Sequence, residues 1–303
     1  MKKIVLFCLA LCAILTVQAQ ETEAQISSLQ SESKVASSLS DRKPVTSKWS
    51  LMIGSAKYAN HYLSPHQYSG TVKGIEAMHG RYFRKSENLS WKLTLGYIGG
   101  KKSTLFGGGL NNPAATSNIS VQGIMADYAV FYNWIIKERL QLRAGGSFNV
   151  YGDYMQTNSN SVNNVLSVQL QTLVNAAFQI RYGWDFKKYG LDLYANVATP
   201  LFGMTALDSR YESFFLSLPN SPSNAKAYNH IAFSSLHNNY GLNLEMGIDF
   251  ALRNLTLSFA YNANNRWWNG NDLQNYRKNS FFKVGISVKL VSLNDRKASS
   301  RQF

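Results

Sequence analysis

Four histidines lie in or beside polar segments where hydrolytic chemistry could be assembled: His61, His66, His230 and His237. The hydroxyl and carboxylate side chains that could serve as their partners are Ser64, Asp208, Ser234 and Ser235. A nucleophilic hydrolase needs a hydroxyl, a base within hydrogen-bond reach and a third group that orients the base. No His-x-Ser or Asp-x-His arrangement falls on one strand face. The sequence therefore predicts no catalytic set.

Metal and cofactor sites also lack their residues. The two cysteines, Cys8 and Cys12, both lie in the first 19 residues, and no two histidines have the spacing of metal ligands on one strand. The run Gly107–Gly109 lacks the Lys-Ser/Thr and the helix that follow a phosphate-binding loop. We expect no metal, no cofactor and no enzymatic activity.

A third set of ionisable residues alternates with apolar residues along the chain. Its members are Glu76, Arg143, Arg181, Glu245, Asp249, Lys283 and Lys289. Because successive side chains of a strand point to opposite faces, these residues would share the face opposite the apolar one. In a closed sheet they would point into the interior, where they either pair and fill it or line a narrow passage. A packed polar interior is favoured because open porins need sixteen to eighteen strands.

The elements that position these residues are β-strands, because the apolar period is two. Leu242, Leu244, Met246, Ile248 and Phe250 alternate with polar or small residues, and the same pattern recurs along the chain. Ten such runs are expected: 48–58, 70–84, 89–100, 118–136, 140–153, 165–186, 190–203, 237–252, 255–266 and 280–292.

The connections between these runs alternate between short and long. The long ones are expected at about 59–69, 101–117, 154–164, 204–236 and 267–279. Short periplasmic turns and long extracellular loops are typical of bacterial outer-membrane barrels. The fold class is therefore predicted as all-β, a transmembrane antiparallel up-and-down barrel of about ten strands.

Aromatic residues at the strand ends support this fold class. One girdle is expected beside the short turns, formed by Trp49, Tyr82, Phe83, Trp91, Trp134, Trp184 and Phe250. A second is expected beside the long loops, formed by Tyr58, Tyr97, Tyr151, Phe202, Tyr240, Trp267, Trp268 and Phe281. Girdles mark the two membrane–water interfaces. In the alternative, a soluble β-sandwich or lipocalin-like barrel, aromatic residues would scatter through the core.

The two ends of the chain are expected to lie outside the barrel. Residues 1–19 combine Lys2 and Lys3 with an apolar run and a Val-Gln-Ala sequence, the pattern of a cleaved signal peptide. The expected division is a signal peptide at 1–19, a mobile periplasmic extension at 20–47, a barrel at 48–293 and a basic tail at 294–303. Without Lys2 and Lys3 the formal charge of +14 falls to +12, since residues 1–19 contain no acid. In an exported chain such a charge indicates anionic lipid rather than nucleic acid.

The segment His61-Tyr-Leu-Ser-Pro-His-Gln-Tyr-Ser-Gly70 resembles an element of an uncharacterised Bacteroidetes-type family of outer-membrane barrels. The resemblance covers most of residues 48–292 and implies a location and a fold, with no assigned activity. The basic end of the chain departs from the usual pattern, in which an aromatic residue closes the last strand.

The function predicted from these features is a non-enzymatic structural or surface-interaction role of a monomeric barrel in the outer membrane of a Gram-negative bacterium. The expected partners are outer-membrane lipids, with an extracellular ligand or a periplasmic partner left open. Candidate loop residues are Phe214, Phe215, Leu216, Trp267 and Trp268. The first alternative is a narrow channel for small solutes, and the second is a lipid-modifying enzyme or protease at the rim.

Overall fold

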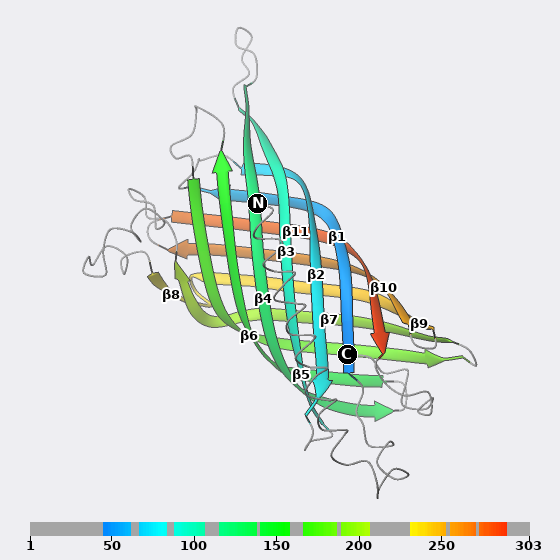
Figure 1. Ribbon diagram of the computed structural model, residues 1–303. Helices are drawn as coiled ribbons and strands as arrows, with labels where there is room; N and C mark the ends of the chain where they lie inside the picture. The colour runs from blue at the N-terminus through cyan, green and yellow to red at the C-terminus, as the bar shows by residue number, and fades with distance from the viewer. Residues whose placement is uncertain are drawn as a thin grey trace, which may run out of the picture. The chain divides into compact units, whose positions relative to one another are not determined.

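The computed structural model describes ten stretches of the chain (Figure 1). They are residues 45–61, 67–83, 88–106, 115–137, 140–157, 166–186, 189–206, 231–252, 255–270 and 273–289. The chain divides into residues 1–42 and 43–303, and all the described residues belong to the second unit. The predicted signal peptide, N-terminal extension and basic tail fall outside the described residues, apart from residues 45–47.

The described residues form eleven β-strands, and none of them forms a helix long and apolar enough to cross a membrane. The strands are β1 (Val45–Asn60), β2 (Gln67–Tyr82), β3 (Leu89–Phe106), β4 (Ala115–Lys137), β5 (Leu140–Thr157), β6 (Leu166–Asp185), β7 (Tyr189–Ala206), β8 (Ile231–Ser235), β9 (Asn239–Leu252), β10 (Leu255–Gly270) and β11 (Leu273–Lys289).

The sheet closes on itself as an antiparallel barrel. Each strand from β1 to β6 pairs with the next, β6 pairs with β7, and β1 pairs with β11. Strand β7 pairs with β8 through residues 202–206 and with β9 through residues 189–198. Strands β8 and β9 therefore occupy one position in the wall between β7 and β10, and the barrel has ten positions. The predicted fold class is confirmed.

The wall is irregular where β8 meets β9. Between the positions that pair β7 with β8 and those that pair it with β9, the β8–β9 side contributes residues 236–242. Over the same interval β7 contributes only residues 199–201. Asn238 closes the intervening turn, because its amide nitrogen donates to the Phe233 carbonyl (2.8 Å) and its amide oxygen accepts the Ser235 N–H (2.8 Å). This local bonding allows the chain to leave the strand for a few residues and return to it.

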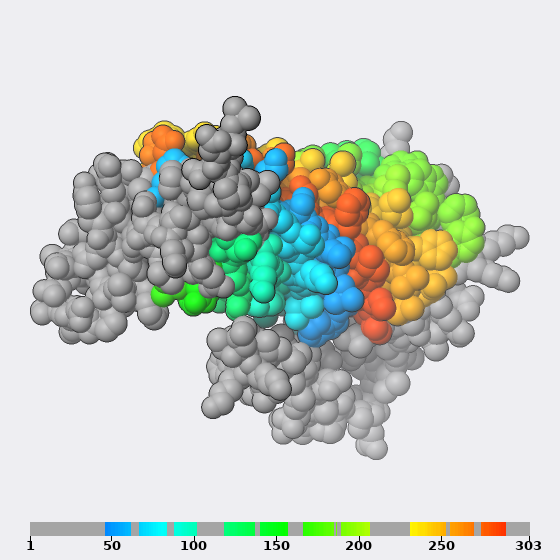
Figure 2. All heavy atoms as spheres, turned by 90° about the horizontal axis from the view of Figure 1, so that it is seen from above, coloured from blue at the N-terminus to red at the C-terminus, as the bar shows by residue number. Residues whose placement is uncertain are grey.

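The outer face of the wall is apolar, and the inner face carries the polar residues. Leu51 and Phe282 are 69% and 65% exposed on the outside, whereas Ser258 and Asp249 are buried inside. In Figure 2 the outer side chains of β1, β2, β10 and β11 form adjoining blue, cyan, orange and red bands. An apolar outer surface around a polar interior is the arrangement of a barrel that spans a membrane. It is the reverse of a soluble barrel.

The barrel has two different ends. We define the turn end as the end of the connections β2–β3, β4–β5, β6–β7 and β9–β10, where the first residues of β1 and the last of β11 also lie. The loop end is the opposite one. The predicted long connection at 267–279 is wrong, because β10 runs to Gly270 and pairs with β11 from Leu273 onward. This segment is rich in Asn and Arg, a composition that favours a loop. Its residues nevertheless extend the paired strands β10 and β11 beyond the apolar band.

The predicted aromatic girdle at the loop end is only partly correct. Phe202, Tyr240 and Trp267 lie on the outer face, and the rings of Tyr240 and Trp267 stack at 5.3 Å. In contrast, four other predicted members are buried in the interior: Tyr58, Tyr151, Trp268 and Phe281. Their even or odd position along the strand, and not their nearness to a loop, decides which face they occupy.

Candidate functional site

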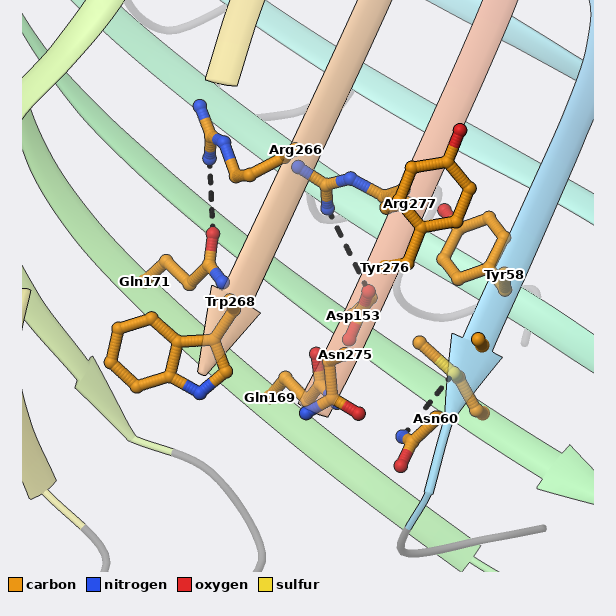
Figure 3. Close-up of a pocket in the computed structure, with 12 residues that line it drawn as sticks. Tyr58, Asn60, Asp153, Gln169, Gln171, Arg266, Trp268, Asn275, Tyr276 and Arg277 are labelled. Atoms are coloured by element: carbon orange, nitrogen blue, oxygen red, sulfur yellow. Dashed lines mark hydrogen bonds and ion pairs between the residues drawn. The ribbon is translucent and has the colours of Figure 1, made fainter. Parts of the chain in front are cut away.

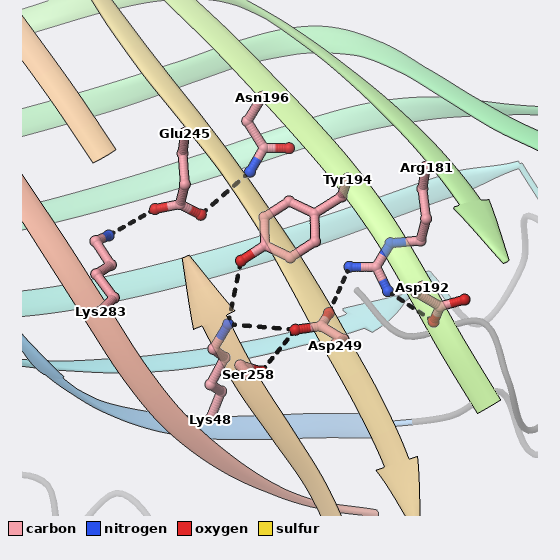
Figure 4. A network of polar contacts seen from close by, with 9 residues as sticks. All are labelled: Lys48, Arg181, Asp192, Tyr194, Asn196, Glu245, Asp249, Ser258 and Lys283. Atoms are coloured by element: carbon pink, nitrogen blue, oxygen red, sulfur yellow. Dashed lines mark hydrogen bonds and ion pairs between the residues drawn. The ribbon is translucent and has the colours of Figure 1, made fainter. Parts of the chain in front are cut away.

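The lumen contains an ion-paired cluster built from strands β2, β9 and β11, of which Figure 4 shows Lys283 and Glu245. Lys283 on β11 lies 2.8 Å from the Glu76 carboxylate on β2 and 2.6 Å from the Glu245 carboxylate on β9. Glu245 also accepts a hydrogen bond from the Asn196 amide at 3.3 Å. A buried ammonium group therefore has two carboxylates around it, as burial of a charge requires.

A second ion-paired cluster lies nearer the turn end and is centred on Asp249. Its carboxylate pairs with Arg181 at 3.2 Å and with Lys48 at 3.7 Å, and it accepts a hydrogen bond from the Ser258 hydroxyl at 2.6 Å. Arg181 also pairs with Asp192 at 3.4 Å. Because Lys48 is on β1 and Asp249 is on β9, this cluster joins strands that are not neighbours in the wall.

Arg143 lies at the same end of the lumen, among amide side chains. Its guanidinium donates to the side-chain oxygens of Gln141 at 3.0 Å and of Gln179 at 3.3 Å. The amide of Gln141 in turn donates to the Tyr82 hydroxyl at 3.1 Å. Tyr82, predicted to belong to the aromatic girdle, thus turns its hydroxyl to the interior.

The loop-end half of the lumen contains an apolar and aromatic cluster instead. Its members are Met52, Ala56, Tyr58, Tyr68, Val72, Ile98, Ile119, Val121, Tyr151, Met155 and Phe281. The hydroxyls of Tyr58 on β1 and Tyr151 on β5 are 3.5 Å apart, so the two rings meet inside the barrel. Close packing of this kind excludes water from the space that it occupies.

At the loop end, side chains from opposite walls touch one another. The Arg277 guanidinium on β11 lies 3.8 Å from the Asp153 carboxylate on β5 and 3.7 Å from the centre of the Tyr151 ring. The Asn60 amide on β1 donates to the Ser167 hydroxyl on β6 at 3.1 Å. Strands β1 and β6 are five positions apart in a ring of ten, as are β11 and β5. The described side chains therefore bridge the full width of the lumen.

A small pocket remains beside these contacts (Figure 3). Its lining includes Asp153, Gln171, Arg266, Trp268 and Arg277. The free space is about 20 Å³, which is room for one or two water molecules. The pocket is a small gap between packed side chains.

Most of the predicted site residues meet inside the barrel. Glu76, Glu245 and Lys283 form one cluster, Arg181 and Asp249 belong to another, and Arg143 lies among amides. Lys289 ends β11, and its side chain falls outside the described part of the chain, as do Phe214, Phe215 and Leu216.

The two predicted loop tryptophans lie instead on strand β10. Trp267 is 37% exposed on the outer face, and Trp268 is 3% exposed in the lumen. The expectation that both belong to an outer loop is wrong, because adjacent residues of a strand point to opposite faces.

The sequence prediction did not include several side chains that belong to the polar contacts in the lumen. Lys48 and Asp192 have the inward strand position and complete the Asp249 cluster. Arg266 falls at the end of a predicted strand, and Arg277 falls in what was predicted as a loop. Continuing the two-residue period forward from Tyr261 would have assigned Arg266 to the inner face, and continuing it backward from Phe282 would have assigned Arg277 to the same face.

The histidine–serine contacts do not assemble a hydrolytic site among the described residues. Ser235 and His237 do meet, with 2.7 Å between Oγ and Nδ1, on the exposed turn between β8 and β9. No described carboxylate bonds to His237 to orient its ring, as a catalytic base requires. Ser234 is buried and hydrogen-bonded to Thr205 at 2.6 Å. His66, His230, Ser64 and Asp208 fall outside the described residues.

Metal ligands are absent from the described residues as well. No group of three or more His, Cys, Asp or Glu side chains in the described ranges could hold a metal ion. The carboxylates of Glu76, Glu245 and Asp249 in the lumen pair with lysine or arginine instead.

Comparison with known sequences identifies a family of unknown function. Residues 4–297 match the family described as Protein of unknown function (DUF3316). The chain belongs to this family. The predicted resemblance to an uncharacterised barrel family is thereby confirmed, while its Bacteroidetes origin stays a prediction. No curated protein sequence matches the chain.

Solved structures similar to this chain have different functions. The outer membrane protease OmpT from Escherichia coli is 9% identical, with a TM-score of 0.45 and coverage of 86% of this chain and 99% of that one. An outer membrane channel from Pseudomonas putida F1 is 8% identical, with a TM-score of 0.38 and coverage of 82% and 96%. Ail, the attachment invasion locus protein of Yersinia pestis, is 7% identical, with a TM-score of 0.29 and coverage of 81% and 98%. None of these likenesses assigns an activity to this chain.

Proposed function

We propose that this protein is a non-conducting barrel of a Gram-negative outer membrane, where it acts as a structural or surface-interaction protein through its loop end. The observation that supports a closed lumen is the contact between opposite walls, above all the pair of Arg277 and Asp153 at 3.8 Å. An open channel needs a continuous aqueous path, and the ion-paired clusters and the aromatic cluster occupy the described lumen at successive levels.

The apolar outer face supports the membrane location in this proposal. Antiparallel strands that close into a barrel satisfy every wall hydrogen bond internally, which a lipid environment requires. The predicted signal peptide at residues 1–19 supplies export, and the predicted extension at 20–47 and the tail at 294–303 would lie in the periplasm. In this proposal the barrel is a monomer, because among the described strands only the five-residue β8, which pairs with β7 alone, keeps an edge that another copy could extend.

The direct test is ion conductance of the refolded protein in a planar lipid bilayer. A heat-dependent gel shift first establishes that the barrel is folded. The wild-type protein is expected to be silent at all voltages at which the bilayer itself is stable. The combined variant Tyr151→Ser and Arg277→Ser, which shortens two side chains that meet inside the barrel, should conduct or show brief openings.

Reproducible unitary currents from the wild-type protein would contradict the proposal and favour the narrow channel. In that case Glu245→Lys and Lys283→Glu should change the ion selectivity, because both side chains belong to the central cluster. A silent wild type with a conducting variant supports the closed lumen.

A further inference from the structure

The outer face of the wall carries a group of lysines on four adjacent strands. Lys278 on β11, Lys57 on β1, Lys73 on β2 and Lys101 on β3 are all exposed. These strands are neighbours in the sheet, in the order β3-β2-β1-β11 (Figure 1). On strands β4 to β10, by contrast, every Lys or Arg side chain that the structure describes is buried in the lumen. We call the four exposed lysines the basic patch.

The strand register brings the lysines of the basic patch close together. Lys57 and Lys278 are directly opposite each other on β1 and β11. Lys73 pairs with a β1 residue four positions from Lys57, and Lys101 lies two residues beyond Gly99, the β3 partner of Lys73. With a strand spacing of about 5 Å and a rise of about 3.3 Å per residue, the four Cα atoms lie within about 16 Å of one another.

No described acid on the outer face balances the basic patch. The carboxylate side chains that the structure describes all belong to the lumen: Glu76, Asp127, Asp153, Asp192, Glu245 and Asp249. Lys57 and Lys278 therefore oppose each other with no described ion pair. Like charges directly opposed on neighbouring strands destabilise a sheet. An anion that binds from outside the protein would remove this repulsion.

The basic patch lies where the apolar band ends on the loop-end side. The last large apolar residues on the outer face of β1, β2 and β11 are Ile53, Ile75 and Phe282. The two outward residues that follow on each strand toward the loop end are polar: Ser55 and Lys57, Lys73 and Thr71, Ser280 and Lys278. A lysine at this height lays its alkyl stem on apolar surface and holds its ammonium group at the membrane–water interface.

We propose that the basic patch binds the phosphate groups of anionic lipids in the membrane leaflet at the loop end. Ammonium groups bind phosphate as point charges, with three donors each. The apolar surface directly below the patch, which includes Ile53 and Phe282, would contact the acyl chains of the same lipid. This continuity of charge and apolar surface favours a lipid over free phosphate, because a free anion gains nothing from the apolar part.

This inference rests on the membrane location in the proposed function and is independent of the closed lumen. A conducting wild-type barrel would contradict the closed lumen and leave the lipid site intact. Failure of lipid binding by a silent barrel would contradict the lipid site alone.

The experiment is native mass spectrometry of the refolded full-length barrel in a neutral detergent. Phosphatidic acid and phosphatidylcholine with identical acyl chains are titrated separately, and a heat-dependent gel shift first establishes that the barrel is folded. The first bound phosphatidic acid is expected to have at least a tenfold lower Kd than phosphatidylcholine, because only its headgroup has a net negative charge. Equal affinities would overturn the proposal.

Variants of the basic patch locate the lipid. Lys73→Gln should weaken binding of phosphatidic acid by about fivefold, and the combined variant Lys57→Gln and Lys278→Gln by about twentyfold. Binding of phosphatidylcholine should stay within about twofold of the wild type. These side chains point away from the interior, so the variants should refold. If the combined variant does not, Lys73→Gln decides, and wild-type affinity in that variant would overturn the assignment.

Arg81→Gln is the matched control, because Arg81 lies near the turn end of β2 with the outward strand position of Lys73. It removes the same charge, and its affinity for phosphatidic acid should stay within about twofold of the wild type. An equal loss in Arg81→Gln and Lys73→Gln would show that overall charge attracts the lipid and would overturn the assignment. Displacement of phosphatidic acid by inorganic phosphate at constant ionic strength would assign the lysines to a free anion instead.

Discussion

The buried cations of the lumen have different partners toward its two ends. Toward the turn end, Lys48, Arg181 and Lys283 each lie within 4 Å of a carboxylate, and these pairs link six strands. At the loop end, Arg266 has only the neutral Gln171 as its described partner. The ion pairs join distant strands of the wall, whereas Arg266 donates to a neutral amide and forms no ion pair among the described residues.

The largest effect is expected from Asp249→Ala, which breaks the paired layer. The substitution leaves Arg181 and Lys48 buried with one carboxylate fewer, so the free energy of unfolding should fall by about 3–5 kcal/mol. Urea unfolding of the barrel in lipid vesicles measures this loss.

Ser258→Ala is the control for Asp249→Ala, because it removes one neutral donor to the same carboxylate and leaves its ion pairs in place. It should cost about 1.5–3 kcal/mol, the range for a hydrogen bond to a charged group. Similar losses for the two variants would mean that the ion pairs of this layer contribute nothing beyond one hydrogen bond.

A substitution on the outer face of the same strand provides a reference for these losses in the free energy of unfolding. Ile248 precedes Asp249 on β9 and is 43% exposed on the apolar outer face. Ile248→Lys should lower the free energy of unfolding by about 2–4 kcal/mol, because the ammonium group would lie in the hydrocarbon region. The same unfolding measurement applies.

Leu252→Lys is the matched control for depth, since Leu252 is the last residue of β9 and lies on the same face. Near the interface the cost should fall to about 0–1 kcal/mol. Equal losses at residues 248 and 252 would show that the outer face of β9 does not cross an apolar layer.

The smallest effect is expected at the loop end. Arg266→Met replaces a buried cation that forms no described ion pair by an apolar side chain of similar length, so the free energy of unfolding should change by no more than about 1 kcal/mol. A gain in stability would sharpen the contrast with Asp249→Ala. A loss above about 2 kcal/mol would mean that Arg266 has a structural partner after all.

The sequence by itself determined the wall of this barrel. The two-residue period along residues 242–252 requires strands, and it separates Ile248 from Asp249 because alternate side chains point to opposite faces. This alternation is a local property of the backbone, so no distant contact is needed to predict it. The ten wall positions follow from the same pattern and from the alternating connections.

Only the tertiary structure decided which inward side chains meet. The contact between Lys48 and Tyr194 joins residues 146 positions apart, and it exists because strand register and closure bring β1 within reach of β7 across the interior. The same closure sets Arg277 against Asp153 and places the Arg266 guanidinium within hydrogen-bond distance of Gln171. Period and composition carry no information on register, because one repeating pattern fits many offsets. The ion-paired clusters therefore form only when the barrel is closed.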